Sequence, residues 1–423
     1  MLIIYTELIY TEIEKMDLSR NVMDVLKERG FLKQTVYGED LYKLLGEEKI
    51  SFYVGFDPTA DSLHIGHYIP VMAMAWMQKY GHTPIALFGG GTGMIGDPSG
   101  RSDLRQMLTK ETIEHNIACF RKQMSRFIDF DKAENKAIMV NNGDWLLNLN
   151  YVDFLRDIGV YFSVNKMLTA ECYKNRMEKG LTFLEFNYML MQGYDFLRLY
   201  RDYGCKLEIG GDDQWSNMLA GEDLIRRKEN APAYAMTCTL LLTSDGKKMG
   251  KTAKGALWLD ENKTTPYEFF QYFRNIEDAK VAECMKLLTF MELDEIEELT
   301  KYKDERINVA KERLAYEVTA LVHGKEKADL ALQQVRASFA GNSENMPTSE
   351  IDGKENKTVI DVLVALGQAK SKGEARRLIE GGGVSIDDAK ITDVLAPVPE
   401  SAVANGSFVL HKGKKVHVKV ILK

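Results

Sequence analysis

Two histidines stand at the start of an apolar run in the stretch "DPTADSLHIGHYIP", which covers residues 57–70. His64 and His67 are three residues apart, so on a helix their rings would share one face. The N-terminus of a helix has unbonded N–H groups and the positive end of the helix dipole, which attract anions. Gly66 lies between the rings and lets a flat group approach the backbone. The stretch therefore favours a nucleotide site, with phosphates at the helix mouth and adenosine over the glycine.

Two other interpretations of the histidine pair remain open. A metal site would need further ligands, and Asp57 and Asp61 are the nearest, without an H-E-x-x-H pattern or a cysteine pair. Alternatively, one histidine caps the helix and the other is buried.

A second motif is the glycine-rich segment "GGGTGMIGDPSGR", in which Gly91, Gly93 and Gly96 spell G-x-G-x-x-G. In dinucleotide-binding folds this pattern opens a helix at once, and the Asp97–Pro98 pair that follows disfavours one. An acidic residue at a strand end about 20 positions later is also missing, because residues 114–117 have a helical pattern. The glycines instead predict a close-approach loop, and Asp97 ends it with a carboxylate that could bind an ammonium group.

A third motif is the segment "DGKKMGKT", residues 245–252. It differs from a Walker phosphate loop because Asp245 stands where that motif needs its first glycine. Lys247, Lys248 and Lys251 would nevertheless place ammonium groups on a flexible loop. Such a loop suits a polyphosphate whose charge rises in a transition state, and the alternative is an ordinary solvated loop.

These motifs need elements that position them, and the N-terminal half predicts a parallel α/β sheet. Residues 49–56 alternate like a strand, residues 63–81 read as a buried helix around Pro70, and residues 83–90 read as a second strand. We expect further strands over 136–142 and 205–211, and helices over 109–128, 150–162 and 185–204.

The C-terminal half has a different pattern. Residues 265–340 are almost purely helical, residues 341–357 have the polar composition of a linker, and residues 406–423 predict a hairpin. From Thr358 onward there are ten Lys and Arg against seven Asp and Glu, a net charge of +3, although the whole chain carries −7. The asymmetry is either chance or the sign of an RNA-binding tail.

Length and composition restrict the class of protein. A chain of 423 residues with 45% hydrophobic content predicts two or three globular domains. Five dispersed cysteines indicate a reducing cytoplasm, without a disulfide framework. We expect no membrane span, because every apolar run is shorter than roughly 18 residues. Residues 1–20 read as an extension of unclear role, in which Met16 is an alternative start and a signal peptide is disfavoured.

Taken together, the motifs carry a resemblance. "HIGH" followed by a late "KMGKT" resembles the paired signatures of class I aminoacyl-tRNA synthetases. The segments "YVGFDPTADSLHIGH", "GDPSGR", "NYMLMQGYDF" and "GGDDQWSN" are similar to the bacterial tyrosyl-tRNA synthetase family in particular. The resemblance covers the chain from about Asn21 to its C-terminus.

The resemblance implies an α/β fold with a Rossmann-like parallel-sheet catalytic domain over 21–245. A lysine loop and a helical anticodon-side domain would follow over 246–340, then the linker 341–357 and a small α+β RNA-binding domain over 358–423. The implied reaction joins ATP and L-tyrosine into tyrosyl-adenylate and then passes tyrosine to the 3′ end of tRNA(Tyr). ATP would be a substrate accompanied by Mg²⁺, without a protein-bound cofactor or metal, and the enzyme would be a homodimer.

The resemblance also assigns roles to individual positions. Those for tyrosine are Tyr53 and Asp195 at its hydroxyl, Asp97, Tyr188 and Gln192 at its ammonium group, and Gln214 at its carboxylate. Those for ATP are Thr59, His64, Lys248, Lys251 and Thr252 in catalysis on the phosphates, His67 as a further catalytic residue near the ribose, and Asp57, Gly66, Gly211, Asp213 and again Lys251 in binding. Those for RNA, in the segment "SKGEARRLIEGGGVSID", are Lys372, Arg376 and Arg377.

Three departures from the family pattern are visible. Gly250 and Thr252 replace two serines of the lysine-loop consensus, and Glu208 stands where glutamine is expected. Two alternatives are a tryptophanyl enzyme or other adenylating enzyme, and a non-catalytic RNA-binding relative.

Overall fold

The computed structural model describes residues 17–97, 108–178, 180–252, 255–340, 348–387, 389–413 and 416–423. The side chains of residues 175, 251–252, 338–340 and 416–417 are outside this description. Residues 1–16 are also outside it, so the predictions about the first 16 residues and an alternative start at Met16 fall beyond the described part. The chain divides into two compact units, one running to Thr265 and over Tyr272–Gly324, the other covering Pro266–Gln271 and Lys325–Lys423.

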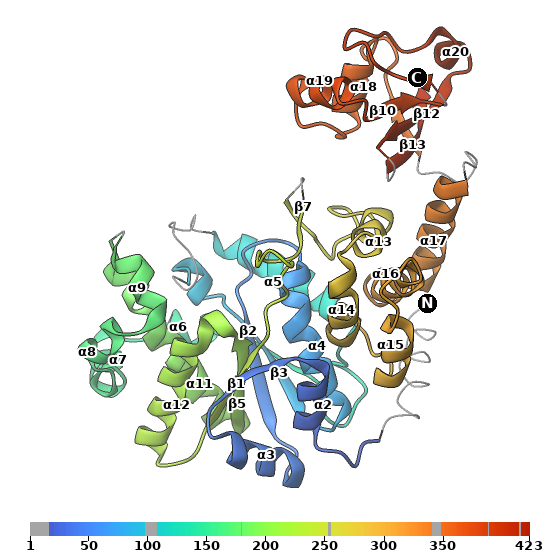
Figure 1. The fold of residues 1–423 in the computed structure, drawn as a ribbon. Coiled ribbons are helices and arrows are strands. Elements are labelled where there is room, and N and C mark those ends of the chain that lie inside the picture. The colour runs from blue at the N-terminus through green and yellow to red at the C-terminus, as the bar shows by residue number, and fades with distance from the viewer. Residues whose placement is uncertain are drawn as a thin grey trace. The chain divides into compact units, whose positions relative to one another are not determined.

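The first unit is built on a six-stranded sheet (Figure 1). Its neighbouring strands are parallel, except that β1 and β6 are antiparallel. In spatial order the strands are β1 (Leu32–Thr35), β6 (Tyr234–Cys238), β5 (Cys205–Gly211), β2 (Ser51–Phe56), β3 (Thr83–Phe88) and β4 (Ile138–Asn141). The chain winds from β2 toward β4 and then returns to β5 on the other side of β2. Ligands of open α/β sheets bind at such a reversal, beyond the carboxyl ends of the strands.

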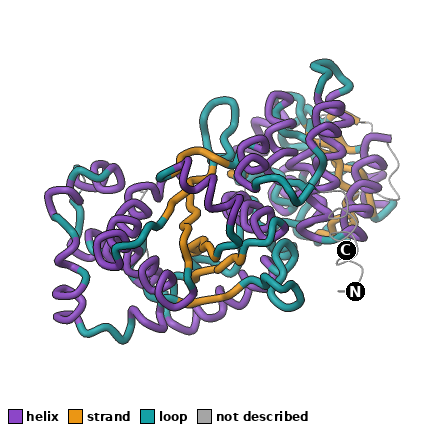
Figure 2. Tube along the Cα trace, turned by 90° about the horizontal axis from the view of Figure 1, so that it is seen from below, coloured by secondary structure: helices purple, strands orange, loops and turns teal. Residues whose placement is uncertain are grey.

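Helices cover both faces of this sheet (Figures 1 and 2). Helices α11 (Tyr188–Tyr203) and α12 (Trp215–Glu229) pack on β5 and β6, and α2 (Val22–Arg29) and α4 (Ile65–Lys79) lie on the other side. Helix α4 is apolar around nearly its whole circumference, which is typical of a buried helix. The helix continues through Pro70. Because proline has no N–H, the helical hydrogen bond from residue 70 to the Gly66 carbonyl is missing.

The predicted elements of the first unit are confirmed, with shifted ends. The strand over 205–211 has the predicted bounds, whereas the helix expected over 150–162 is divided into α7 and the 3-10 turn η2. The remaining elements up to residue 256 are α3 (Gly38–Glu47), η1 (Thr92–Met94), α5 (Lys110–Met124), α6 (Gly143–Leu146), α7 (Tyr151–Asp157), η2 (Gly159–Tyr161), α8 (Val164–Leu168), α9 (Glu171–Met177), α10 (Phe183–Phe186), η3 (Asp212–Gln214), β7 (Lys251–Thr252) and β8 (Gly255–Ala256).

The helical region expected from Thr265 is also present. It consists of α13 (Pro266–Arg274), η4 (Asp278–Lys280), α14 (Val281–Leu288), α15 (Leu293–Thr300), α16 (Ile307–His323) and α17 (Lys325–Ala340).

The second unit contains a five-stranded sheet in the order β11-β10-β12-β13-β9, with its own apolar core. The predicted C-terminal hairpin is confirmed as β12 paired with β13. The elements are β9 (Thr348–Ile351), α18 (Val359–Ala365), α19 (Lys372–Glu380), β10 (Val384–Ile386), β11 (Ala389–Lys390), α20 (Glu400–Ala404), β12 (Ser407–Lys412) and β13 (Val416–Leu422).

The linker predicted over 341–357 is too long, because β9 lies within it and pairs in parallel with β13. In β9, with the sequence "TSEI", Ile351 is the buried side chain. An edge strand can keep its other residues polar, because they face solvent. A polar edge strand therefore has the composition of a linker.

Candidate active site

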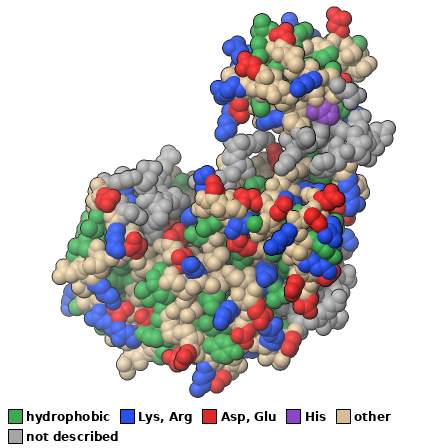
Figure 3. Space-filling view, in the orientation of Figure 1, with side chains coloured by type: hydrophobic (Ala, Val, Ile, Leu, Met, Phe, Trp, Pro, Cys, Tyr) green, Lys and Arg blue, Asp and Glu red, His purple; other side chains and the backbone are tan. Residues whose placement is uncertain are grey.

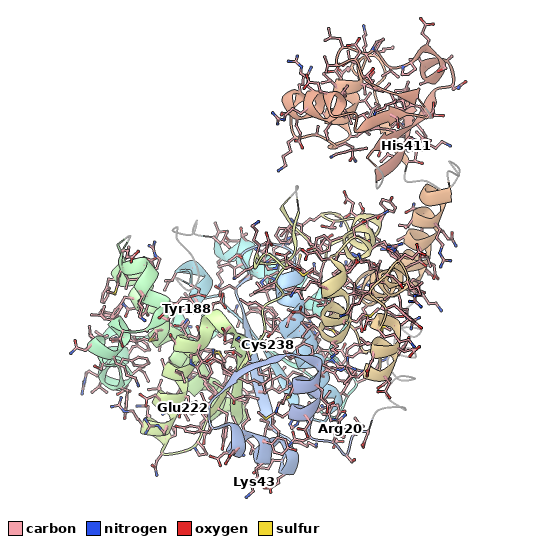
Figure 4. All side chains as sticks on the ribbon, in the orientation of Figure 1. Arg20, Lys43, Tyr188, Glu222, Cys238 and His411 are labelled. Carbon is pink, nitrogen blue, oxygen red and sulfur yellow. The ribbon has the colours of Figure 1, made fainter. Side chains whose placement is uncertain are left out.

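A cavity of about 510 Å³ opens at the carboxyl ends of β2 and β5, beside the start of α4. Tyr188 at the start of α11 and Cys238 at the end of β6, both labelled in Figure 4, belong to its wall. The cavity gathers residues from all three motifs. The predicted site residues that line it are Tyr53, Asp57, His64, Gly66, His67, Asp97, Tyr188, Gln192, Asp195, Gly211, Asp213, Gln214 and Lys248.

The two histidines cap α4 together. His64 is the N-cap residue, and its Nδ1 accepts the Gly66 N–H at 3.0 Å, while the Nδ1 of His67 accepts the His64 N–H at 3.3 Å. The rings stack with centroids 3.9 Å apart. The capping interpretation is therefore right for His64, but His67 completes the cap instead of being buried in the core. Because each Nδ1 accepts, each neutral ring carries its proton on Nε2, which makes that nitrogen a donor.

Deep in the cavity, Asp195 on α11 is held by two donors. Its Oδ2 accepts from Asn142 Nδ2 at 2.8 Å and its Oδ1 accepts from Trp145 Nε1 at 2.7 Å. Burial raises the pKa of the Asp195 carboxyl to about 8, although these two hydrogen bonds act in the opposite direction. Asn142 also accepts the Gly91 N–H at 2.8 Å, so it ties the glycine-rich loop to Asp195.

Sequence reasoning missed Asn142 and Trp145. Asn142 comes directly after β4, a strand that was predicted, and Trp145 lies in the short helix α6 that follows; a polar residue at the carboxyl end of a parallel strand is the signal that could have found Asn142.

Beside Asp195 lies a group of buried polar atoms. Tyr53 on β2 is paired in register with Glu208 on β5, and Glu208 Oε1 accepts from Gln192 Nε2 at 2.9 Å. Burial raises the pKa of the Glu208 carboxyl to about 7. Among the described residues, the Tyr53 hydroxyl, Gln192 Oε1 and Glu208 Oε2 have no hydrogen-bond partner. Each such buried atom costs roughly 1–3 kcal/mol, so a polar ligand that bonds to them would be favoured here.

The end of the glycine-rich loop faces η3. Asp97 Oδ2 accepts from Gln214 Nε2 at 2.6 Å, and Gln214 Oε1 accepts from Asn217 Nδ2 at 3.2 Å. Asp97 is the residue predicted to bind an ammonium group, and Gln214 is the one predicted to lie at the substrate carboxylate. The hydrogen bond from Gln214 therefore already orients one oxygen of the Asp97 carboxylate.

The glycine-rich loop itself contains the 3-10 turn η1 where a dinucleotide site would begin an α-helix. A Cβ at Gly90 would lie 2.0 Å from Asn141 Oδ1, and one at Gly89 would lie 2.5 Å from Asp57 Oδ1. Around Gly89 and Gly90 the loop thus lies close to Asn141, the last residue of β4, and to Asp57, the residue after β2.

The lysine loop lies over the start of α4. Lys248 Nζ is 3.5 Å from Asp213 Oδ2, and the Gly250 N–H donates to the Tyr272 hydroxyl at 2.8 Å. The Gly250 carbonyl accepts the Leu257 N–H at 2.7 Å, and the Leu257 carbonyl accepts the Ile65 N–H at 3.0 Å. Backbone hydrogen bonds thus connect the "KMGKT" segment to the "HIGH" segment.

Three predicted residues are not placed in the cavity wall. Thr59 is exposed in the loop after β2, and its N–H donates to the Asp57 carbonyl at 2.8 Å. Lys251 and Thr252 form the short strand β7, and their side chains lie outside the described part of the chain.

The predicted RNA-binding residues lie on α19 of the second unit. Lys372, Arg376 and Arg377 are exposed, whereas Ala375 and Ile379 point into the core of that unit. Lys372 Nζ is 2.8 Å from Asp361 Oδ1. The space-filling view shows Lys and Arg side chains on one face of this unit, with Asp and Glu among them (Figure 3).

In the part of the chain that the structure describes, no three His, Cys, Asp or Glu side chains are grouped as metal ligands. None of the helices there is both long enough and apolar enough to cross a membrane.

Comparisons with known proteins agree over about 95% of the chain. The family described as "tRNA synthetases class I (W and Y)" matches residues 45–340, and the "Tyrosine--tRNA ligase SYY-like C-terminal domain" matches residues 338–420. The chain is 59% identical over 407 residues to a tyrosine–tRNA ligase of Clostridium botulinum, covering 95% of this chain and all of that protein. A tyrosine–tRNA ligase of Acetivibrio thermocellus is 58% identical, covering 95% of this chain and 99% of the relative.

A solved structure gives the same result. A C-terminally truncated mitochondrial tyrosyl-tRNA synthetase of Aspergillus nidulans superposes with a TM-score of 0.67 and 30% identity, covering 75% of this chain and 94% of that one.

Proposed function

The chain belongs to the tyrosine–tRNA ligase family of class I aminoacyl-tRNA synthetases, and from that premise we propose how its residues divide the reaction. The enzyme activates L-tyrosine with ATP to tyrosyl-adenylate, releases pyrophosphate, and transfers tyrosine to tRNA. The observation that supports the residue roles is the set of unpartnered buried polar atoms in a cavity beside a helix mouth.

Tyr53 and Asp195 bind the hydroxyl of the substrate. The Tyr53 hydroxyl is buried without a partner among the described residues, and Asp195 is held rigidly by Asn142 and Trp145. Asp97, Tyr188 and Gln192 bind the ammonium group, and Gln214, which donates to Asp97, lies by the substrate carboxylate.

ATP binds across the mouth of α4. Asp57, Gly66, Gly211 and Asp213 form its binding surface, with Asp213 and Gly211 at the ribose. His64 and His67 offer Nε2–H donors there, and Thr59 would reach the phosphates from its exposed loop. Lys248, Lys251 and Thr252 clamp the departing pyrophosphate.

The chemistry needs no general base, because the tyrosine carboxylate is already a nucleophile. Its oxygen forms a bond to the α-phosphorus, the bond from that phosphorus to the oxygen bridging to the β-phosphorus breaks, and the electron pair leaves with pyrophosphate. Catalysis is then alignment of the reactants plus stabilisation of charge on the phosphates. Donors and cations are what the cavity wall supplies. Mg²⁺ would accompany ATP as part of the substrate and neutralise the same charge.

The chain would work in the cytoplasm, where its five free cysteines stay reduced.

The chain would also form a homodimer. Large exposed apolar side chains concentrate between residues 147 and 184, and hydrophobic atoms reach the surface at the left of Figure 3, where Figure 1 places α7 and α9. They include Tyr151, Val152, Val160, Val164, Phe183 and Leu184. Sedimentation of a 48.0 kDa species at micromolar concentration would contradict the dimer.

A substitution in the lysine loop tests the proposed mechanism. Lys251→Ala should slow tyrosine-dependent ATP–pyrophosphate exchange while leaving tyrosine affinity near normal, because the loop acts on charge that develops in the transition state. Lys247→Ala is the matched control, since Lys247 pairs with Asp245 in the same loop and is not part of the cavity wall. Equal losses in tyrosine affinity and rate for Lys251→Ala would refute the assignment.

A further inference from the structure

Glu208 is a buried acid whose position departs from the family pattern. Its side chain is 3% exposed, it lies on the central strand β5, and it belongs to the cavity wall. Oε1 accepts from Gln192 Nε2 at 2.9 Å, and Oε2 has no partner of full hydrogen-bond geometry among the described residues, although the nearby Tyr53 hydroxyl acts with Gln192 to lower the pKa of this carboxyl against the effect of burial.

This contact fixes the direction of the Gln192 amide. An amide donates through its NH₂ group and accepts through its carbonyl oxygen. An acceptor such as Glu208 Oε1 therefore binds the NH₂ group, and the carbonyl oxygen points away from it. Glu208 Oε1 occupies the NH₂ end. Gln192 Oε1 is buried without a partner in the described part of the chain, and Gln192 lines the cavity. Its carbonyl oxygen therefore needs a donor from a ligand, and an ammonium group carries three N–H donors.

We propose that Glu208 is a positioning residue for tyrosine, which holds the Gln192 amide so that the Gln192 carbonyl oxygen faces the substrate ammonium group. This inference rests on the proposed role of Gln192 in ammonium binding. A glutamine at position 208 could also present its NH₂ group to Gln192 and so stabilise the flipped amide. A carboxylate has only acceptors and therefore permits a single direction, and Glu208 is in this form above its raised pKa of about 7, so the tests below are made at pH 8.

The first test compares two ligands and two variants. In Glu208→Leu, the KM for tyrosine in ATP–pyrophosphate exchange should rise about tenfold with kcat within about twofold, because the contact is equal in ground and transition states. In Glu208→Gln the KM for tyrosine should rise only about twofold, because a glutamine at position 208 still permits the productive direction of the Gln192 amide beside the flipped one. The affinity for 3-(4-hydroxyphenyl)propionate, which lacks the ammonium group, should be unchanged by both substitutions. This ligand also verifies that the Glu208→Leu variant retains its fold.

An equal loss of affinity for both ligands would overturn the proposal, because Glu208 would then act on the phenol or on the fold. An unchanged KM for tyrosine in Glu208→Leu would overturn it as well.

The second test separates positioning from direct binding. Gln192→Leu should weaken tyrosine alone, and adding Glu208→Leu to it should have little further effect, because the residue through which Glu208 acts is gone. If Gln192→Leu leaves tyrosine affinity unchanged, the proposed role of Gln192 fails. If Gln192→Leu weakens tyrosine and the second substitution multiplies the loss, the role of Gln192 survives and the positioning role of Glu208 is wrong.

Discussion

At the scale of single residues, recognition of the substrate hydroxyl depends on Tyr53. Tyr53 is 1% exposed, and its hydroxyl lies near Glu208 but has no partner of full hydrogen-bond geometry among the described residues, so bound tyrosine would bond to it and phenylalanine would leave it without that bond. Tyr53→Phe should therefore reduce the preference for tyrosine over phenylalanine on the order of tenfold, measured as the ratio of kcat/KM in pyrophosphate exchange.

Tyr68→Phe is the control for that experiment. Tyr68 is equally buried on α4, but its hydroxyl donates to the Leu288 carbonyl, away from the cavity wall. Its removal should lower stability and leave the preference unchanged. A preference that stays constant in Tyr53→Phe refutes the assignment.

The raised pKa of Asp195 gives a pH-dependent stability. The native carboxyl keeps its proton up to about pH 8, whereas in the unfolded chain it loses the proton near the ordinary value of 3.8. Unfolding thus releases a proton between these values, and the free energy of unfolding falls as pH rises from about 4 to about 8. Asp195→Asn removes this contribution.

Urea unfolding of the wild type and Asp195→Asn at several pH values measures the effect. The stability of the wild type relative to the variant should fall across that range and become constant above about pH 8. Glu208 is present in both proteins, and its charge adds to the effect of burial on the pKa of Asp195, so the difference measures Asp195 together with its coupling to Glu208. A difference that does not change with pH would show that Asp195 is ionised in the folded enzyme.

At the scale of elements, Gly250 allows the lysine loop to lie on α4. Its φ is +86°, and a Cβ there would lie 1.9 Å from Ile65 Cγ2. Gly250→Ala should therefore displace the loop and lower kcat of pyrophosphate exchange by about tenfold or more, with tyrosine affinity unchanged.

Gly246→Ala separates the contact from backbone strain. Gly246 lies in the same loop at φ +80°, and a Cβ there would meet nothing within 4 Å. It should cost only the left-handed strain of roughly 1–2 kcal/mol. Adding Ile65→Ala to Gly250→Ala removes Cγ2 and should restore part of the rate. If both glycine variants lose the same activity, the packing on Ile65 has no role in catalysis.

The same scale shows how far the sequence predicts the fold. The strand over 205–211 and the helix after "LHIGH" carry strong local patterns, and both were predicted. The strand β6 is fully buried and does not alternate, and β1 and β9 are short polar edge strands, so their patterns are weak. The contact between Asp195 and Asn142 joins residues 53 apart in sequence, so no local pattern could predict it.

At the scale of the whole molecule, the part of the second unit from Thr348 to Lys423 should serve the tRNA step alone. The cavity residues proposed for ATP and tyrosine lie between Tyr53 and Lys248, whereas the apolar core cluster of the C-terminal part is formed, among the described residues, by side chains between 351 and 422. A segment with its own core can be removed without unfolding the rest. The A. nidulans protein that this chain resembles is itself a C-terminally truncated one.

Truncation after about Ser343 should therefore preserve tyrosine-dependent pyrophosphate exchange and lose most tRNA charging. The loss should appear as a higher KM for tRNA, since basic side chains such as Arg376 and Arg377 supply phosphate contacts that weaken with salt. In the full chain, Arg376→Glu with Arg377→Glu should give the same defect and a shallower salt dependence. A truncated protein that is folded by circular dichroism and charges tRNA normally would show that the segment beyond residue 343 is not needed for tRNA binding. A folded truncated protein that fails in exchange would instead place part of the catalytic unit beyond residue 343.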